Sequence, residues 1–521
     1  MIVRARPGHR HQAALAVRSA GGTLGRDLTI VDGFAARLPA SAARRLGTDR
    51  SIAAITPNRA VRFSSLTSAA VGPLIASNYP TSTGASSVWG KTNSGGEVTV
   101  ALIDTGVRQV DDLAGRVMAG PDFSAEGDSR TDSYGHGTVM AGIIAGDGTD
   151  SAGDLAGAYI GMAPRATVLS VKVAGRNGAT DVSTVLAAMQ WVGSHAAANH
   201  IRAVNISWGT TSDQSPTLDP LNYAVERLWS AGVVVIAAAG NAGPAAGTIT
   251  KPGDDPMVIT AGAYDDRLDA GLTNDLIPAW SSRGPTAAGL VKPDLVAPGR
   301  TIVATRSPGS YVDTTFPEAR IGSAYIRGSG TSQATAVVTG AVALMFAYRP
   351  WLTPDQVKYA LTATAQPIAY ISPTVQGQGR LWLPTALGLR VRSAPDQHSS
   401  ATGLGSIEQS RGDRHVETIC AGNTTVTRIE GEQDALCLPW NPQQWTTSDA
   451  WTSDAWTSDA WTADSWTADS WTADSWTSDF LTAFWGVRTP WWHRVPGEAA
   501  EVAPRQLALT TAMAKREDRR R

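Results

Sequence analysis

Cysteine is nearly absent from this sequence, whose 521 residues include only Cys420 and Cys437. This scarcity excludes Cys-x-x-Cys metal sites and a scaffold held together by many disulfides. The two cysteines fit two interpretations, a single disulfide in an exported protein or a pair of buried free thiols. The sequence alone does not choose between them.

An excess of one charge is also missing. The 44 Lys and Arg residues nearly balance the 46 Asp and Glu residues, which gives a formal net charge of -2. A protein that binds nucleic acid or an anionic membrane usually carries a basic surface. We therefore expect neither partner, and an ordinary polypeptide or a small molecule as the substrate.

Long apolar runs are lacking too. No stretch reaches the roughly eighteen apolar residues that a transmembrane helix needs, so no transmembrane segment is expected. The apolar stretch 336–348 is too short to span a bilayer and fits a buried core helix. The first residues do not follow the basic, apolar and small-residue order of a secretory signal. Either the protein stays inside the cell or its true start lies upstream.

What the sequence does contain is enough apolar material for a large core. Hydrophobic residues make up 42% of the chain and charged residues 17%, as in globular proteins. Composition and pattern divide it into six parts: a small α+β unit (1–66), a Ser-, Thr-, Gly- and Pro-rich linker (67–87), a large domain (88–390), a polar linker (391–444), a Trp repeat (445–480) and a charged tail (481–521).

The large domain alternates apolar strands with helices. Strands are expected at 97–104, 167–173, 203–207, 233–239 and 257–261, and two of the helices between them at 182–195 and 220–231. Strands that are apolar throughout are typical of a parallel sheet covered on both faces. The fold class is therefore α/β, with a parallel sheet sandwiched by helices. In the small unit the order strand, helix, strand, helix, strand predicts helices on one face of a sheet.

The Trp repeat places a tryptophan at every fifth residue from Trp451 to Trp476. A period of five matches neither a strand nor a helix, so an ordinary amphipathic element is excluded. Low-complexity sequence favours disorder or partial order. Because exposed tryptophans are unusual, stacking on glycans and a small solenoid are the alternatives.

Three polar side chains stand where a loop meets a regular element. Asp104 ends an apolar strand, His136 opens a helix after Gly135, and Ser332 opens the apolar helix that follows Gly330. A serine hydroxyl needs a base to become a nucleophile, a histidine is that base near neutral pH, and an aspartate fixes its tautomer. Taken one at a time, the three are better interpreted as an ion-pair partner, a core histidine and a helix cap; together they indicate a catalytic triad.

Several motifs around these residues resemble the subtilisin family, or subtilases, over about residues 88–365. The chain order Asp, His, Ser is the order known for that family. The matching segments are Gly135–Thr138, Gly161–Pro164, Val171–Val173, Ser281–Pro285, Lys292–Asp294, Ala297–Gly299, Gly328–Ser332 and Leu352–Pro354. Many matches in the right order make a strong signal, whereas one motif would be weak.

The resemblance implies a serine endopeptidase that hydrolyses peptide bonds. Asn241 and the Ser332 backbone N–H would form the oxyanion hole. The edge that pairs with extended substrate would be Ser207, Trp208 and Gly209, with Ala238, Ala239 and Gly240 lining the primary pocket. Trp208 would wall a more distant apolar pocket; its alternative role is core packing.

The same resemblance implies that residues 1–66 are an inhibitory propeptide, on the evidence of 33–38 and the strand order. The protein would be a zymogen that cuts itself between Phe63 and Ser87, and it would be secreted or attached to the cell surface. No cofactor is expected. Calcium is a common structural ion in the family, but no ligands for it can be assigned here.

The chain departs from the family pattern at two places. Val139 and Met140 follow the histidine motif where the family usually has His and Val, and Gln333 follows the nucleophile where it usually has Met. Gln333 thus puts a polar side chain at a normally apolar position. A non-catalytic surface-binding protein that works through its Trp repeat is the alternative function, and the intact triad argues against it. His136 excludes the related carboxylate-based serine peptidases, which have Glu there.

Overall fold

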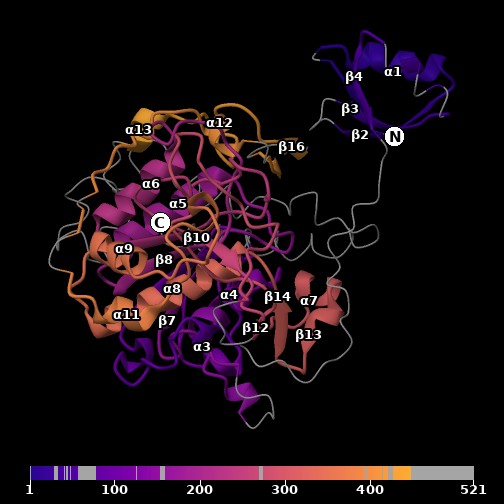
Figure 1. Cartoon of the computed structure of the whole chain (residues 1–521). Helices are drawn as coiled ribbons and strands as arrows, with labels where there is room; N and C mark the ends of the chain where they lie inside the picture. Colours follow the sequence, from indigo (N-terminus) through magenta and orange to yellow (C-terminus); the bar gives the residue numbers. More distant parts are fainter. Residues whose placement is uncertain are drawn as a thin grey trace, which may run out of the picture. The chain divides into compact units, whose positions relative to one another are not determined.

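The computed structural model divides the chain into two compact units, Met1–Gly72 and Pro73–Arg521 (Figure 1). The first boundary predicted from the sequence lies a few residues before this division. The residues that the structure describes are 2–6, 8–28, 33–39, 42, 45–46, 49–56, 78–124, 126–152, 159–268, 274–391, 394–395, 397–412, 415–420 and 426–446. Residues 447–480 of the Trp repeat and the charged tail lie outside these residues, as does much of the linker 67–87. The same holds for three of the six residues 41–46, where the second helix of the small unit is expected.

The N-terminal unit is a four-stranded antiparallel sheet with one described helix. The strands β1 (Ile2–Ala5), β2 (Thr23–Leu28), β3 (Gly33–Arg37) and β4 (Ile52–Thr56) are arranged in the order β2-β3-β1-β4. Helix α1 (Arg10–Ser19) buries Ala13 and Val17 in the unit's core, beside Val3 and Phe34. Strand β2 ends at Leu28 and β3 begins at Gly33, and residues 29–32 lie outside the described residues.

The larger unit is built on a seven-stranded parallel sheet. Its strands are β5 (Thr99–Asp104), β6 (Val117–Asp122), β7 (Thr167–Lys172), β8 (Ile201–Ile206), β9 (Val234–Ala238), β10 (Ile259–Tyr264) and β11 (Leu295–Pro298). Their order is β11-β10-β9-β8-β5-β7-β6, and every pair is parallel. The chain reverses its direction of strand addition beside β5, which is where ligand sites form at the carboxyl ends of α/β sheets.

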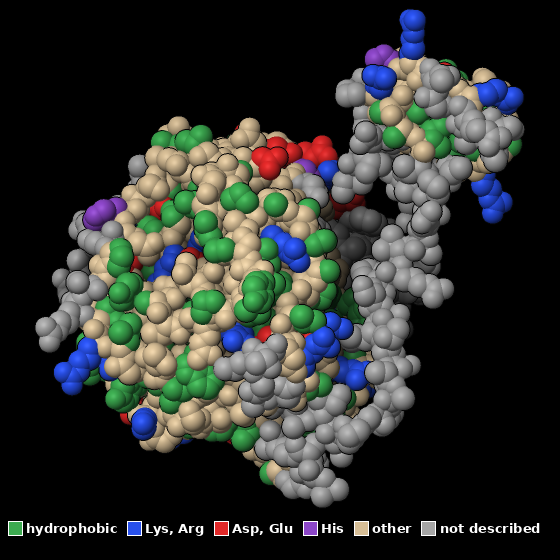
Figure 2. Space-filling view, viewed as in Figure 1, with side chains coloured by type: hydrophobic (Ala, Val, Ile, Leu, Met, Phe, Trp, Pro, Cys, Tyr) green, Lys and Arg blue, Asp and Glu red, His purple; other side chains and the backbone are tan. Residues whose placement is uncertain are grey.

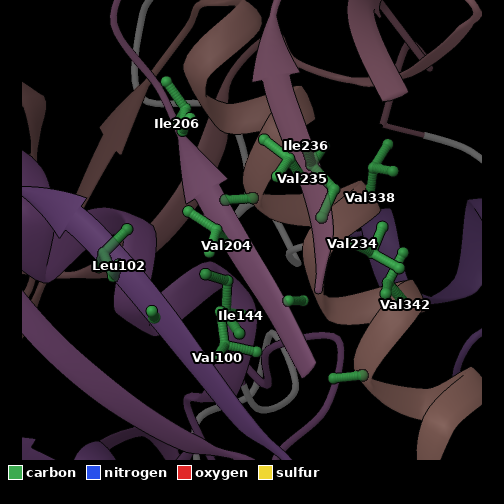
Figure 3. Packing of buried hydrophobic residues seen from close by; sticks show 14 of the residues in the cluster. Val100, Leu102, Ile144, Val204, Ile206, Val234, Val235, Ile236, Val338 and Val342 are labelled. Atoms are coloured by element: carbon green, nitrogen blue, oxygen red, sulfur yellow. The ribbon is translucent and has the colours of Figure 1, made fainter. Parts of the chain in front are cut away.

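Helices cover this sheet. Helices α4 (His136–Ala145) and α8 (Thr331–Tyr348) pack against each other and against the sheet, and α5 (Val182–His195) packs with α6 (Pro220–Ser230) against β5 and β9. The core is continuous between these layers, and Figure 3 shows Val338 and Val342 of α8 beside Val234 of β9. Most of the strands are largely apolar because both faces of the sheet are buried, whereas the edge strand β6 is mostly exposed or half-buried.

Helix α8 is the one helix among the described residues that is long and apolar enough to cross a membrane by length and composition. In the structure 89% of its apolar window is buried inside the protein. It is thus the central core helix predicted from the run 336–348. Its burial explains its composition, since a helix apolar all round must be covered on every side.

A second, three-stranded sheet lies beside α4. It contains β12 (Ile302–Thr305), β13 (Arg320–Ile321) and β14 (Tyr325–Gly328), in the order β12-β14-β13, and the short helix α7 (Tyr311–Thr315) precedes β13. Asp313 anchors this loop through ion pairs with Arg306 and Arg320, both 2.7 Å. The loop 307–321 is therefore folded structure.

Residues 397–446 form a further segment that packs on the larger unit, here called the C-terminal strap. It contains α12 (Ile407–Arg411), β15 (Glu417–Ile419), β16 (Val426–Arg428) and α13 (Pro442–Thr446), and a Cys420–Cys437 disulfide. The disulfide decides between the two interpretations of the cysteines. The described part of 391–444 is thus a folded strap, whereas its polar composition predicted a linker.

The strap is held by buried polar contacts. Arg411 is fully buried and its Nε lies 2.7 Å from Asp181 Oδ2, at the N-terminus of α5. Glu226 of α6 accepts hydrogen bonds from Ser400 and Ala401 backbone N–H groups, both 2.8 Å. Satisfied polar groups can be buried, and a polar sequence can therefore belong to a folded element.

The viewed face of the larger unit carries hydrophobic side chains scattered among polar ones, without one broad apolar area (Figure 2). Scattered apolar side chains are ordinary on a soluble surface.

Candidate active site

The first component of the site is a buried carboxylate bound to a histidine. Asp104, the last residue of β5, lies with Oδ1 2.8 Å and Oδ2 2.9 Å from His136 Nδ1. Asp104 is only 4% exposed, and its Oδ1 also accepts a hydrogen bond from Thr105 N–H at 2.8 Å. The pairing places the imidazole proton on Nδ1 and leaves Nε2 free to accept a proton.

The loop before His136 is fixed by a second buried carboxylate, Asp132. Its two oxygens accept hydrogen bonds from Gly135 N, Thr138 N, Thr138 Oγ1 and Thr105 Oγ1, at 2.6–2.8 Å. Gly135 begins α4 at φ 103°, a left-handed conformation that glycine adopts without a steric penalty. His136 therefore sits in the first turn of a helix whose entry geometry is fixed on both sides.

A neighbouring charge and burial have opposite effects on the pKa of His136. Burial on its own lowers the pKa of the imidazole, but the charge and hydrogen bond of Asp104 outweigh it, so the pKa is raised above its ordinary value of 6.5. The physical cause is that Asp104 stabilises the imidazolium form. A histidine in this setting can take a proton from a neighbour and hold it as a stabilised cation.

Ser332 lies in the first turn of α8 beside the end of β8. Its Oγ donates a hydrogen bond of 2.9 Å to the carbonyl oxygen of Ser207, and Ser207 Oγ donates to the Ser332 carbonyl oxygen at 3.3 Å. Within the described residues Ser332 and His136 share no hydrogen bond. Rotation of Ser332 about its χ1 bond releases Oγ from Ser207, and such contacts often tighten only when substrate is bound.

Asn241 is oriented toward the same helix terminus. Its Oδ1 accepts hydrogen bonds from Thr331 N at 2.9 Å and Thr331 Oγ1 at 3.1 Å, which leaves the Nδ2 group to donate elsewhere. A Cβ placed on Gly330 would lie 3.4 Å from Asn241 Nδ2 and 3.7 Å from Ser332 N. Two N–H donors thus border the space beside Gly330, and this arrangement can stabilise an oxyanion.

The predicted substrate edge follows β8. Ser207 is 7% exposed, and the Trp208 indole packs against the core and donates to the Ile103 carbonyl oxygen at 3.1 Å. Trp208 is therefore fixed on the strand that carries Asp104. Beyond it, the edge continues to Thr210, which bridges to Lys251 through paired backbone hydrogen bonds of 2.9 and 3.1 Å.

The predicted pocket residues follow β9. Ala238 and Ala239 are buried and Gly240 is partly exposed. Thr250 fills the space between Gly240 and Gly209, because a Cβ on Gly240 would lie 2.8 Å from Thr250 Cγ2 and one on Gly209 would lie 2.5 Å from Thr250 Oγ1. One threonine side chain therefore separates the two predicted walls.

The described residues contain no group of three or more His, Cys, Asp or Glu that could hold a metal ion.

The structure brings Asp104, His136, Ser332 and Asn241 to the carboxyl ends of β5, β8 and β9. The sequence interpretation missed Asp132 and Thr250. Asp132 stands four positions before His136 in a polar loop where no periodicity singles it out, and Thr250 is an ordinary residue whose position depends on the tertiary fold.

A strand-end carboxylate, a histidine bound to it, a serine at a helix N-terminus and two convergent N–H donors define a serine-nucleophile hydrolase site on an α/β sheet. The family model of the subtilase family matches residues 95–405 of the chain. This is more than half of its length, and the chain therefore belongs to the subtilase family of serine proteases.

Individual relatives agree. The chain is 38% identical over 295 residues to serine protease AprX of Bacillus subtilis (strain 168), covering 56% of this chain and 66% of that protein. It is 34% identical over 290 residues to subtilisin Savinase of Lederbergia lenta, covering 56% and 90%. Against AprX the match spans just under two thirds of the relative's length. Among solved structures, Sphericase aligns with 27% identity and a TM-score of 0.47, covering 56% of this chain and 92% of that one.

Proposed function

We propose that the protein is a serine endopeptidase in which Asp104, His136 and Ser332 form the catalytic triad and Asn241 completes the oxyanion hole. The observation that carries this proposal is the Asp104–His136 pair. Both carboxylate oxygens lie within 2.9 Å of Nδ1, which orients Nε2 as a base. A merely structural ion pair would not need the serine and amide donors beside it.

The chemistry follows from this arrangement. His136 Nε2 takes the proton of Ser332 Oγ as Oγ attacks the carbonyl carbon of the substrate, and the carbonyl oxygen becomes an oxyanion. Asn241 Nδ2 and Ser332 N donate hydrogen bonds to that oxygen. The imidazolium then gives its proton to the leaving amine, which releases the first product. Water, activated by the same imidazole, hydrolyses the acyl-enzyme and restores Ser332.

Substrate recognition would use the edge at Ser207–Gly209. An extended peptide can add to an exposed strand edge through its main chain, while pockets select its side chains. Thr250 limits the depth of the pocket between Gly209 and Gly240, which favours small and medium apolar side chains there. The Trp208 indole is held against the core, and it supplies a rigid wall.

We further propose that the N-terminal unit is an inhibitory propeptide and that the protein is a secreted or cell-surface zymogen. The unit has its own hydrophobic core, which supports independent folding. The Cys420–Cys437 disulfide supports an oxidising compartment. Self-cleavage between Phe63 and Ser87 would separate the two units. No cofactor takes part in the proposed chemistry.

Labelling of the nucleophile tests the proposed function. A fluorophosphonate, which phosphonylates an activated serine with loss of fluoride, should label the wild-type protein on Ser332, as located by peptide mapping. Ser332→Ala should not be labelled, and His136→Ala should be labelled much more slowly. The control Ser372→Ala removes an exposed serine outside the site and should be labelled like the wild type. Labelling spread over several serines, or unchanged in Ser332→Ala, would contradict the triad.

A further inference from the structure

Gln333 directly follows the proposed nucleophile, and its carboxamide lies at the oxyanion site. The residue is 8% exposed. A Cβ placed on Gly330 would lie 2.7 Å from Gln333 Oε1, and that same point is 3.4 Å from Asn241 Nδ2 and 3.7 Å from Ser332 N. Three polar groups, one from the loop after β9 and two from α8, therefore surround one small space.

The carboxamide has no hydrogen-bond partner among the residues that the structure describes. Its Nε2 lies over Gly328, where a Cβ would be 2.8 Å away, and its Oε1 lies beside Gly330. The carboxamide carries both an acceptor and two donors, so it can form a hydrogen bond with a substrate oxygen that enters this space. The side chains around it belong to the catalytic site.

We propose that Gln333 is a third polar residue of the oxyanion site. Its carboxamide would present Oε1 to the site in the free protein and Nε2 during the reaction. In the free protein Oε1 lies beside Gly330, in the space that a substrate oxygen would enter. When the substrate carbonyl oxygen enters, the carboxamide turns by half a rotation about its last side-chain bond. Nε2 then donates a hydrogen bond to the oxyanion.

The rotation is inexpensive because the terminal torsion of glutamine is broad and nearly two-fold. It also removes a conflict, since Oε1 would repel the negative charge that forms on the substrate oxygen whereas Nε2–H stabilises it. Gly330, which has no side chain, leaves room for this movement. The inference rests on the proposed endopeptidase function.

The test compares Gln333→Met, which has similar length and no donor, with Gln190→Met, which replaces a buried glutamine of α5 away from the site. Steady-state hydrolysis of a peptide amide gives kcat and KM, and a peptide aldehyde, which forms a tetrahedral adduct with the serine, reports oxyanion binding. A hydrogen bond to a charged group predicts that Gln333→Met lowers kcat about tenfold or more. The aldehyde should bind more weakly by a similar factor, with KM changed less than twofold. Gln190→Met should leave all three values unchanged.

Wild-type values for kcat and aldehyde affinity in Gln333→Met would overturn the proposal. The proposal would also be overturned if kcat and aldehyde affinity fell equally in Gln333→Met and Gln190→Met together with the melting temperature, because such losses indicate a structural role. If Gln333→Met does not fold, Gln333→Glu keeps the shape and places a carboxylate at the oxyanion; wild-type kcat in that variant would also overturn it. A wild-type protein that neither cleaves the peptide nor binds the aldehyde would instead refute the proposed function, and this assignment with it.

Discussion

At the scale of single residues, Asp104 controls which nitrogen of His136 carries the proton. Asp104→Asn keeps the shape but permits the wrong tautomer, and we expect kcat to fall by about 10⁴ with little change in KM. Steady-state hydrolysis of a peptide amide measures this loss. Asp111→Asn, at an exposed aspartate near the same strand, should remain fully active. A loss of less than tenfold in Asp104→Asn would show that the pair is structural.

The raised pKa of His136 predicts how activity depends on pH. The base must be neutral, so kcat/KM should fall as the pH drops through a pKa that lies above 6.5. That profile reports ionisation in the free enzyme. Asp104→Asn removes the stabilising charge, and its residual activity should therefore have an acid limb at lower pH. An acid limb below pH 6.5 in the wild type would contradict the assignment.

Asp132 predicts a loss of both stability and activity. Asp132→Ala leaves up to four buried donors without an acceptor, and each unsatisfied group costs about 1–3 kcal/mol. We expect a clearly lowered free energy of unfolding, measured by urea denaturation in a Ser332→Ala background to prevent self-digestion. In the active background kcat should fall, because Gly135 and His136 lose their anchor. A variant as stable as the parent would rule out this role.

The residues of the proposed triad could be singled out from the sequence because Asp104, His136 and Ser332 each occupy a short motif at the end of an element. Asp132 and Gln333 show the limit. The partners of the Asp132 carboxylate come from two separate segments, at Thr105 and at Gly135–Thr138, and the position of the Gln333 carboxamide depends on the fold of Gly328–Gly330. Neither feature can be recognised from a pattern in a single sequence.

At the scale of elements, the strap and α5 depend on one buried ion pair. Arg411→Met leaves Asp181, whose side chain is 2% exposed, without its charge partner. Breaking a buried pair costs about 3–5 kcal/mol, and the melting temperature should fall accordingly. Asp181→Ser in the same protein removes the charge but keeps an N-cap for α5, and the double variant should recover part of the loss. No recovery would mean that Arg411 acts mainly through its other contacts.

Five strands of the large sheet, β5 and β7 to β10, follow the predicted apolar runs to within a few residues, because burial on both faces demands a largely hydrophobic sequence. Strands β6 and β11 are not among the predicted strands. The strap could not be predicted in the same way. Many of its contacts are ion pairs and hydrogen bonds to α5 and α6, and only a few side chains, such as Ile407 and Trp445, join the core. They are made by a segment whose composition is typical of a linker.

At the scale of the whole molecule, the two compact units predict a processing event. When the protein is incubated, it should lose a fragment of the size of the N-terminal unit. Gel electrophoresis and mass spectrometry measure this loss. Ser332→Ala should keep its full length, and addition of active wild type shows whether its linker is accessible to cleavage in trans. Processing of purified Ser332→Ala on its own would contradict self-cleavage.

The most direct test of the central claim is hydrolysis of an unfolded protein such as casein by the wild type and by Ser332→Ala, purified in parallel. Casein fragments in the wild-type sample and none with Ser332→Ala are the predicted result. Equal hydrolysis by both proteins, or none by either after removal of the N-terminal unit, would contradict the assignment of Asp104, His136 and Ser332 as a working catalytic triad.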